Sequence, residues 1–123
     1  MGFSPTGSAR PWLPVPAEWK RHAVSRQTRD SGSVLHLYRT ALGIRAEHRA
    51  LGTGEATVST RGDVLTVRCT GGGRTVRCVV NMGTGTALVR SRGQVLLESG
   101  PGVHTSARSV ALPPDTAVWI AEA

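Results

Sequence analysis

The feature that most constrains the fold is a series of short apolar and β-branched runs, separated by glycine-rich turns, from about residue 53 onward. The runs span 56–60, 63–70, 75–82, 87–89, 94–99, 107–112 and 116–120. Apolar and polar residues alternate clearly in 63–70 and 75–82, so each of these strands has an apolar face. Those faces carry Leu65, Val67 and Cys69 in the first strand and Val76, Cys78 and Val80 in the second. Short strands at this spacing predict an antiparallel β-sandwich.

One earlier stretch has a helical pattern. Residues 30–48 place apolar side chains three and four positions apart, which predicts an amphipathic helix that Asp30 or Ser33 can cap. Its apolar stripe comprises Val34, Leu35, Leu37, Tyr38, Ala41, Leu42 and Ile44. Arg45 falls near the middle of this stripe, and a guanidinium buried there needs a carboxylate or several carbonyl partners. We expect the boundary with the β region near Leu51-Gly52.

The N-terminal stretch has a different character. Four prolines in residues 1–22 predict an extended, irregular loop, and a short helix is expected at 23–29. Trp12 and Trp19 lie in this loop. An indole ring there can stack on a pyranose sugar or pin the loop onto a core, and we favour packing for Trp12. For Trp119, in the last strand, we expect packing in the core.

Charge and composition bear on the partners. The formal net charge of +7 comes from 15 basic and 8 acidic residues, and every basic residue except Lys20 is arginine. The arginines are scattered from Arg10 to Arg108, and residues 50–118 contain no aromatic residue, so the pattern argues against nucleic-acid binding. The sequence contains no run of about 20 apolar residues, so we expect no membrane-spanning helix. The N-terminus has no apolar secretory core, which predicts a cytoplasmic protein.

No set of residues for catalysis stands out. The acidic residues are separated along the chain, no Ser-His-Asp arrangement is visible, and the four histidines are dispersed. We therefore expect no catalytic, cofactor-binding or metal-binding residue. Cys69 and Cys78 form either a disulfide across a hairpin or two reduced thiols, and reduced thiols are favoured in a cytoplasmic protein.

Several motifs, in their order along the chain, resemble one region of glycoside hydrolase family 13, the α-amylase family. They are GFSPTG (2–7), PWLPVP (11–16), Gln27, residues 30–39 and Arg45. The likeness is to the α-glucosidases and oligo-1,6-glucosidases, in which such motifs form the loop after the eighth strand of the catalytic (β/α)₈ barrel and the last helix of that barrel. Tyr38 and Arg45 match residues of this helix. Asp30-Ser31 departs from the usual Asp-Pro of the family.

The later strands resemble the C-terminal β-sandwich domain of the same family, over 78–89, 95–100 and 112–120. The resemblance implies a mainly β fold with N-terminal helix, in which residues 1–50 are a remnant of the barrel and residues 51–123 are the sandwich. This family uses a carboxylate nucleophile and a carboxylic acid/base, and both lie upstream of the matched segment. The resemblance therefore assigns no catalytic residue to this chain.

The resemblance implies a C-terminal fragment of an α-glucosidase-like enzyme that is inactive alone. The parent enzyme would act on α-glucosides or maltooligosaccharides, and an upstream barrel polypeptide would be the partner, with no cofactor. Phe3 and Trp12 would contact sugar or pack the loop, and the structural residues would be Tyr38, Arg45 and Trp119. Two alternatives stay open: a stand-alone β-sandwich module that binds α-glucans, and, with less support, a basic nucleic-acid binder.

Overall fold

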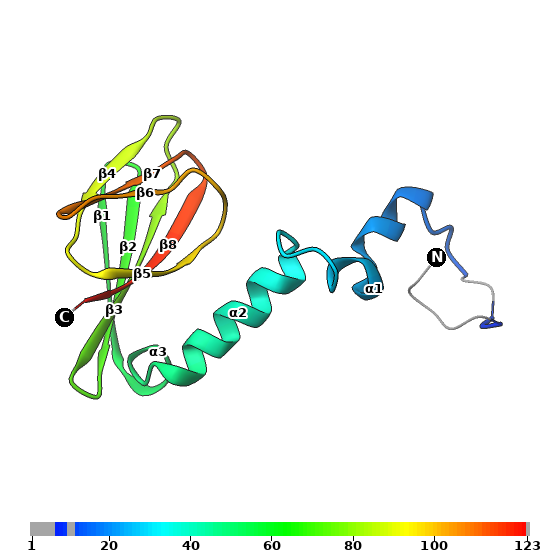
Figure 1. The fold of residues 1–123 in the computed structure, drawn as a ribbon, viewed down its shortest axis with the longest axis horizontal. Helices are drawn as coiled ribbons and strands as arrows, with labels where there is room; N and C mark the ends of the chain where they lie inside the picture. Colours follow the sequence, from blue (N-terminus) through cyan, green and yellow to red (C-terminus); the bar gives the residue numbers. More distant parts are fainter. Residues whose placement is uncertain (1–6, 10–11, 123) are drawn as a thin grey trace. The chain divides into compact units, whose positions relative to one another are not determined.

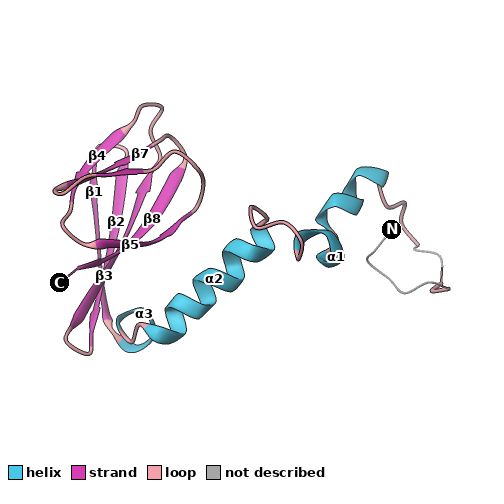
Figure 2. Ribbon diagram, viewed as in Figure 1, coloured by secondary structure: helices cyan, strands magenta, loops and turns pink. Residues whose placement is uncertain are grey.

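Strands dominate the computed structural model, which describes residues 7–9 and 12–122. In this part of the chain eight strands form two antiparallel sheets, and the helices precede the first strand (Figure 1, Figure 2). The chain divides into two units, Met1–Ala41 and Leu42–Ala123, and the division falls inside helix α2. Over the described residues, no helix has the length and apolar character needed to cross a membrane.

In the first unit, two short helices lead into α2. They are the 3₁₀-helix η1 (Ala17–His22) and α1 (Val24–Gln27), and α2 spans Val34–Glu47. Of the two caps that the sequence allowed, Asp30 and Ser33, it is Ser33 that caps α2, because its hydroxyl accepts a hydrogen bond from the His36 amide at 3.2 Å. Gln27 adds a contact that the pattern did not predict. Its Oε1 accepts from the Leu35 amide at 3.0 Å, and its Nε2 donates to the His22 carbonyl at 2.7 Å.

The end of the predicted N-terminal loop is helical instead. Pro16 takes the N-cap position of η1, with φ −56° and ψ 140°, and the Trp19 amide donates to the Pro16 carbonyl at 3.2 Å. A proline restricts itself and the residue before it, so the prolines exclude a helix only as far as Pro16. The residues that follow are free to form a short 3₁₀-helix.

The second unit contains the end of α2, a short helix α3 (Ala50–Thr53) and the strands. The strand order is β1-β2-β3-β8-β5 in the five-stranded sheet and β4-β7-β6 in the three-stranded sheet. The strands are β1 (Glu55–Arg61), β2 (Val64–Gly71), β3 (Arg74–Asn81), β4 (Ala87–Arg90), β5 (Gln94–Glu98), β6 (His104–Thr105), β7 (Ser109–Leu112) and β8 (Thr116–Glu122). This is the mainly β, antiparallel sandwich that the sequence predicted, and of the elements in the second unit only α3 and β6 lacked a signal.

Glycine accounts for the tight β2–β3 hairpin. Gly71 pairs with Arg74, so the loop consists of Gly72 and Gly73, whose φ values are +62° and +73°. A two-residue hairpin with both central residues in the left-handed region is the turn that follows the natural twist of the strands. The glycine cluster at 71–73 is therefore a turn, as the sequence indicated.

The core lies between the two sheets and consists of aliphatic side chains. Val79, Val118 and Ile120 of the five-stranded sheet pack against Val110 and Leu112 of the three-stranded sheet. Partly buried valines surround them: Val64, Val89, Val95 and Val103. Each such side chain contributes about 1.5–3 kcal/mol when it is fully buried.

The expectation that Trp119 packs in this core is wrong. Buried and half-buried residues alternate along β8, and Trp119 is a half-buried position between the buried Val118 and Ile120. Because successive side chains of a strand point to opposite faces, Trp119 lies on the face of the sheet away from the core. Core packing was expected because Trp119 is large and lies in an apolar strand. Neither property specifies which face of the sheet the side chain occupies.

A buried amide joins the turn after β3 to the end of β7. The Asn81 side chain is 1% exposed. Its Nδ2 lies 2.8 Å from the Gly85 carbonyl oxygen, 3.0 Å from that of Leu112 and 2.9 Å from that of Pro113. Its Oδ1 accepts from the Gly83 amide at 3.0 Å. The side chain thus satisfies loop groups that strand pairing leaves unpaired.

Candidate functional site

The five-stranded sheet has a second apolar face, on the side away from the core. Cross-strand partners share a face of a sheet, so the register identifies its members. One row crosses all five strands and comprises Val58, Val67, Cys78, Trp119 and Leu97. The flanking rows comprise Thr60, Leu65, Val80 and Ala117 on one side and Ala56, Cys69, Val76 and Ala121 on the other. We call these three rows the outer face.

The outer face is partly accessible. Val58 is 67% exposed, and most of the other apolar members are half-buried, whereas Val76 is fully buried. Helix α3 covers one end of this face. A Cβ atom added at Gly71, the outer-face position after Cys69, would lie 3.3 Å from the Cα of Ala50. An apolar sheet surface of this kind is typical of a region that packs against another protein part.

The two cysteines lie side by side on the outer face, and both are free. Cys69 pairs with Val76 and Cys78 with Val67, so the two are diagonal rather than direct partners. The pKa of the Cys78 thiol is raised, because burial and the neighbouring Cys69 raise it more than a hydrogen bond with Trp119 lowers it. Since the thiolate is the reactive form, Cys78 is a poor nucleophile near neutral pH.

Helix α2 also presents apolar side chains to solvent. Val34 is 64% exposed, Tyr38 65% and Leu42 59%. Arg45 is exposed as well, so its guanidinium is hydrated and does not need the buried partner that the sequence pattern called for. A structural role for Tyr38 and Arg45 stays a prediction.

The predicted sugar-contact residues lie in the first unit. Trp12 is 91% exposed and Trp19 is 52% exposed, so both indole rings are accessible. Phe3, the other predicted contact, lies outside the residues that the structure describes. A sugar-contact or loop-packing role for Trp12 and Phe3 therefore stays a prediction.

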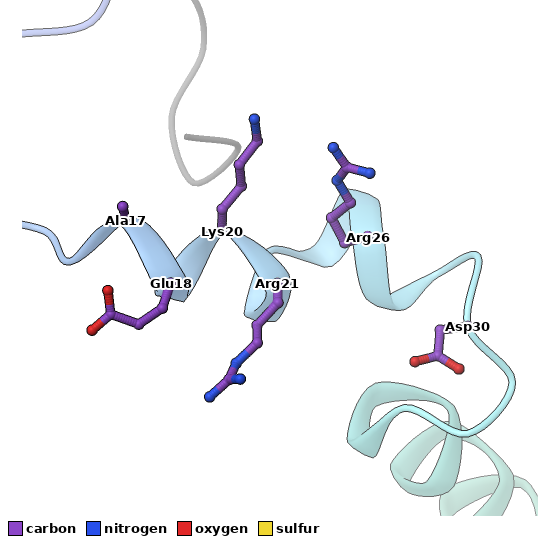
Figure 3. A pocket seen from close by; sticks show the side chains of 6 residues that line it. All are labelled: Ala17, Glu18, Lys20, Arg21, Arg26 and Asp30. Carbon is purple, nitrogen blue, oxygen red and sulfur yellow. The ribbon is translucent and has the colours of Figure 1, made fainter.

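A shallow hollow of about 480 Å³ lies beside η1 and α1. Its charged lining residues are Glu18, Lys20, Arg21, Arg26 and Asp30, and their side chains point in different directions rather than toward a common point (Figure 3). Asp30 is engaged in its own turn, where its Oδ1 accepts from the Gly32 amide at 2.9 Å. Across the described ranges, no three His, Cys, Asp or Glu side chains gather into a metal site.

Sequence reasoning missed one polar feature, a groove lined by arginines on the core side of β1 and β2. The signal was present, because Thr57, Ser59 and Arg61 alternate along one strand face. Alternating polar residues on an edge strand normally indicate a solvated face, so the pattern alone did not distinguish a groove from ordinary surface.

The comparisons with known proteins concern both units. The family model described as "Domain of unknown function (DUF3459)" matches residues 53–119. A "Probable alpha-glucosidase" from Rhizobium meliloti (strain 1021) is 43% identical over 82 residues, which cover 66% of this chain and 14% of that protein. The chain thus spans about one seventh of the curated relative that it matches.

Solved structures of MutB resemble most of the chain. The trehalulose synthase MutB from Pseudomonas mesoacidophila MX-45 superposes with a TM-score of 0.77 at 25% identity, covering 92% of this chain and 22% of that chain. A MutB mutant from crystals soaked with trehalulose gives a TM-score of 0.78 at 26% identity, over 93% of this chain and 22% of the other. Another MutB mutant is in complex with the substrate sucrose.

Proposed function

Because this chain belongs to the DUF3459 family and is a C-terminal region of glycoside hydrolase family 13, we propose that it is the non-catalytic, structural part of an α-glucosidase-like enzyme. In this proposal residues 1–50 belong to the catalytic barrel and residues 51–123 form the accessory sandwich. The parent enzyme would hydrolyse α-glucosides in the cytoplasm, and the chain alone would be inactive.

The observation that carries the proposal is the outer face. It combines Trp119, Leu97 and several valines on the side of the sheet that the core does not use. Interfaces between permanent partners are more apolar than ordinary surface, because burying apolar area supplies most of their free energy. The outer face therefore suits a permanent contact with the catalytic polypeptide.

A chimera tests this role. The matching region of the Rhizobium meliloti relative is replaced by this chain, and hydrolysis of a chromogenic α-glucoside is measured. Val58→Lys on the outer face should lower the yield of active chimera several-fold, because it would bury an unpaired charge in the interface. Val58 is 67% exposed in this chain, so the change leaves the fold of the chain intact.

Met82→Lys is the matched control, because Met82 is 56% exposed and lies in the turn after β3. This variant should support as much activity as the unaltered chimera. Equal losses in both variants would contradict the role of the outer face. Turnover of the α-glucoside by the isolated chain at enzyme-like rates would contradict the claim that the chain is inactive alone.

A second candidate function rests on Trp12, whose indole is 91% exposed. An accessible indole face can stack on the apolar face of a pyranose, so the chain could bind α-glucans as a stand-alone module. Calorimetric titration with maltotriose then gives saturable heat that Trp12→Ala reduces. Trp19→Ala is the control, and no heat at millimolar sugar would end this candidate.

A further inference from the structure

A groove opens on the core side of the β1–β2 edge of the five-stranded sheet. Its volume is about 630 Å³, which lies within the range of small-molecule sites. Four arginines from four strands line it: Arg61 of β1, Arg68 of β2, Arg77 of β3 and Arg90 of β4. Both sheets therefore contribute to the groove, and positive charge dominates its lining.

One carboxylate compensates part of this charge. Arg68 and Arg77 are direct cross-strand partners, and like charges in such a pair repel each other. Glu122 of β8 binds both, with 2.6 Å from the Arg68 Nη1 to its Oε2 and 3.0 Å from the Arg77 Nε to its Oε1. The Arg77 Nη2 also donates to the Arg90 carbonyl at 2.9 Å, which fixes the guanidinium between the two sheets.

Two of the four arginines have no carboxylate partner in the described part of the chain. Within the described residues, no carboxylate forms an ion pair with Arg61 or Arg90. Four guanidinium groups thus face one carboxylate. An anion bound in the groove would relieve this imbalance, and arginine binds phosphate through two parallel N–H···O bonds.

Hydroxyl groups complete the lining. Thr57, Ser59 and Thr66 line the groove, and Ser59 and Thr66 are direct cross-strand partners. They supply neutral donors beside the arginines, which suits the oxygens of a phosphate or the hydroxyls of a sugar. The lining has no aromatic side chain on which a nucleic-acid base could stack.

We propose that this groove is a binding site for a small phosphate dianion, either inorganic phosphate or a phosphomonoester, held by Arg61 with the hydroxyls of Thr57, Ser59 and Thr66. The site is separate from the outer face, so it is independent of the proposed packing role. Two sources share this chemistry, free inorganic phosphate and a phosphorylated sugar. The proposal covers both sources, and separate titrations with inorganic phosphate and with a sugar phosphate distinguish them.

Calorimetric titration of the full chain at low ionic strength tests the site. Inorganic phosphate and glucose 6-phosphate are titrated separately, with glucose as the neutral control. At least one of the two phosphates should give saturable binding that salt weakens, and glucose should give none. Tighter binding of glucose 6-phosphate would identify the sugar phosphate as the source. Absence of binding by both phosphates at millimolar concentration would overturn the proposal.

Substitutions of single arginines test whether the phosphate binds in this groove. Arg61→Gln should weaken binding about tenfold or more, because a charge-assisted hydrogen bond is lost. Arg108→Gln, at an exposed arginine of the β6–β7 turn, is the matched control and should bind like the parent chain. Equal affinity for Arg61→Gln and the parent chain would overturn the proposal.

Amide chemical shifts provide a second readout that needs no variant. Phosphate should move the amide signals of Thr57, Ser59 and Thr66, while those of the outer-face residues stay in place. Shifts confined to other parts of the chain would overturn the assignment of the site.

Discussion

The buried amide of Asn81 should contribute strongly to the stability of the sandwich. Its Nδ2 and Oδ1 bind four backbone groups of the β3–β4 turn and of the end of β7 and the residue after it. Asn81→Ala leaves these groups without partners in a buried site, and we expect a loss of about 3 kcal/mol in the free energy of unfolding. Urea unfolding followed by far-UV circular dichroism measures it. The control, Thr84→Ala in the same turn, should change little, and similar losses in both would contradict this role.

The thiol of Cys78 makes stability depend on alkaline pH. Its pKa in the folded chain is raised, mainly by burial, above the ordinary value of 9.0. The stabilisation is therefore fully present below the pKa of the unfolded chain and is lost as the pH rises through the pKa of the folded chain. The urea midpoint should fall in this alkaline range, and Cys78→Val should reduce the fall. The urea midpoints of the parent chain and of Cys78→Val are first measured at pH 7, and their difference there, which reflects the change in packing, is subtracted from the values at higher pH. Identical pH dependence would contradict the assignment.

At the scale of elements, two glycines let α3 lie on the outer face. A Cβ atom at Gly71 would lie 2.8 Å from the Cα of Gly54 and 3.3 Å from that of Ala50. Gly71→Ala should therefore displace α3 and lower the thermal midpoint by several degrees. Gly43→Ala in α2 is the matched control, since nothing lies within 4 Å of its added Cβ. It should stabilise α2 by up to about 1 kcal/mol. Higher midpoints in both variants would contradict the close contact at Gly71.

The same scale shows what the sequence could predict. Helix α2 followed from helical spacing, and seven strands followed from short apolar and β-branched runs between turn signals, with clear alternation in two of them; all of these are local signals. Strand β6 has only two residues, which are too few to show a pattern. Helix α3 packs closely against Gly71, which is distant in sequence, and a glycine at that position gives no side-chain signal. The outer face was partly visible in Leu65, Val67 and Cys69. Which face of β8 the core would use, and hence the place of Trp119, depended on the order of the strands.

For the whole molecule, the outer face predicts self-association. Accessible apolar rows on β1, β2 and β8 should bring copies together as the concentration rises. Light scattering should show a mass that grows with concentration, and Val58→Lys should shift the chain toward monomer. Leu88→Lys, at a 75% exposed residue of β4 outside this face, serves as control. A clean monomer of the parent chain at high concentration would refute this prediction.

The aliphatic core has a spectroscopic consequence. The core cluster contains only valine, leucine and isoleucine, whereas Trp12 and Trp19 are in the first unit and Trp119 is on the outer face. Tryptophan fluorescence therefore reports on surfaces rather than on the interior of the sandwich. Covering the outer face should shift the Trp119 emission to the blue while circular dichroism stays unchanged. In a chain in which Trp12 and Trp19 are replaced by phenylalanine, Trp119 would therefore be an intrinsic sensor of docking at the outer face.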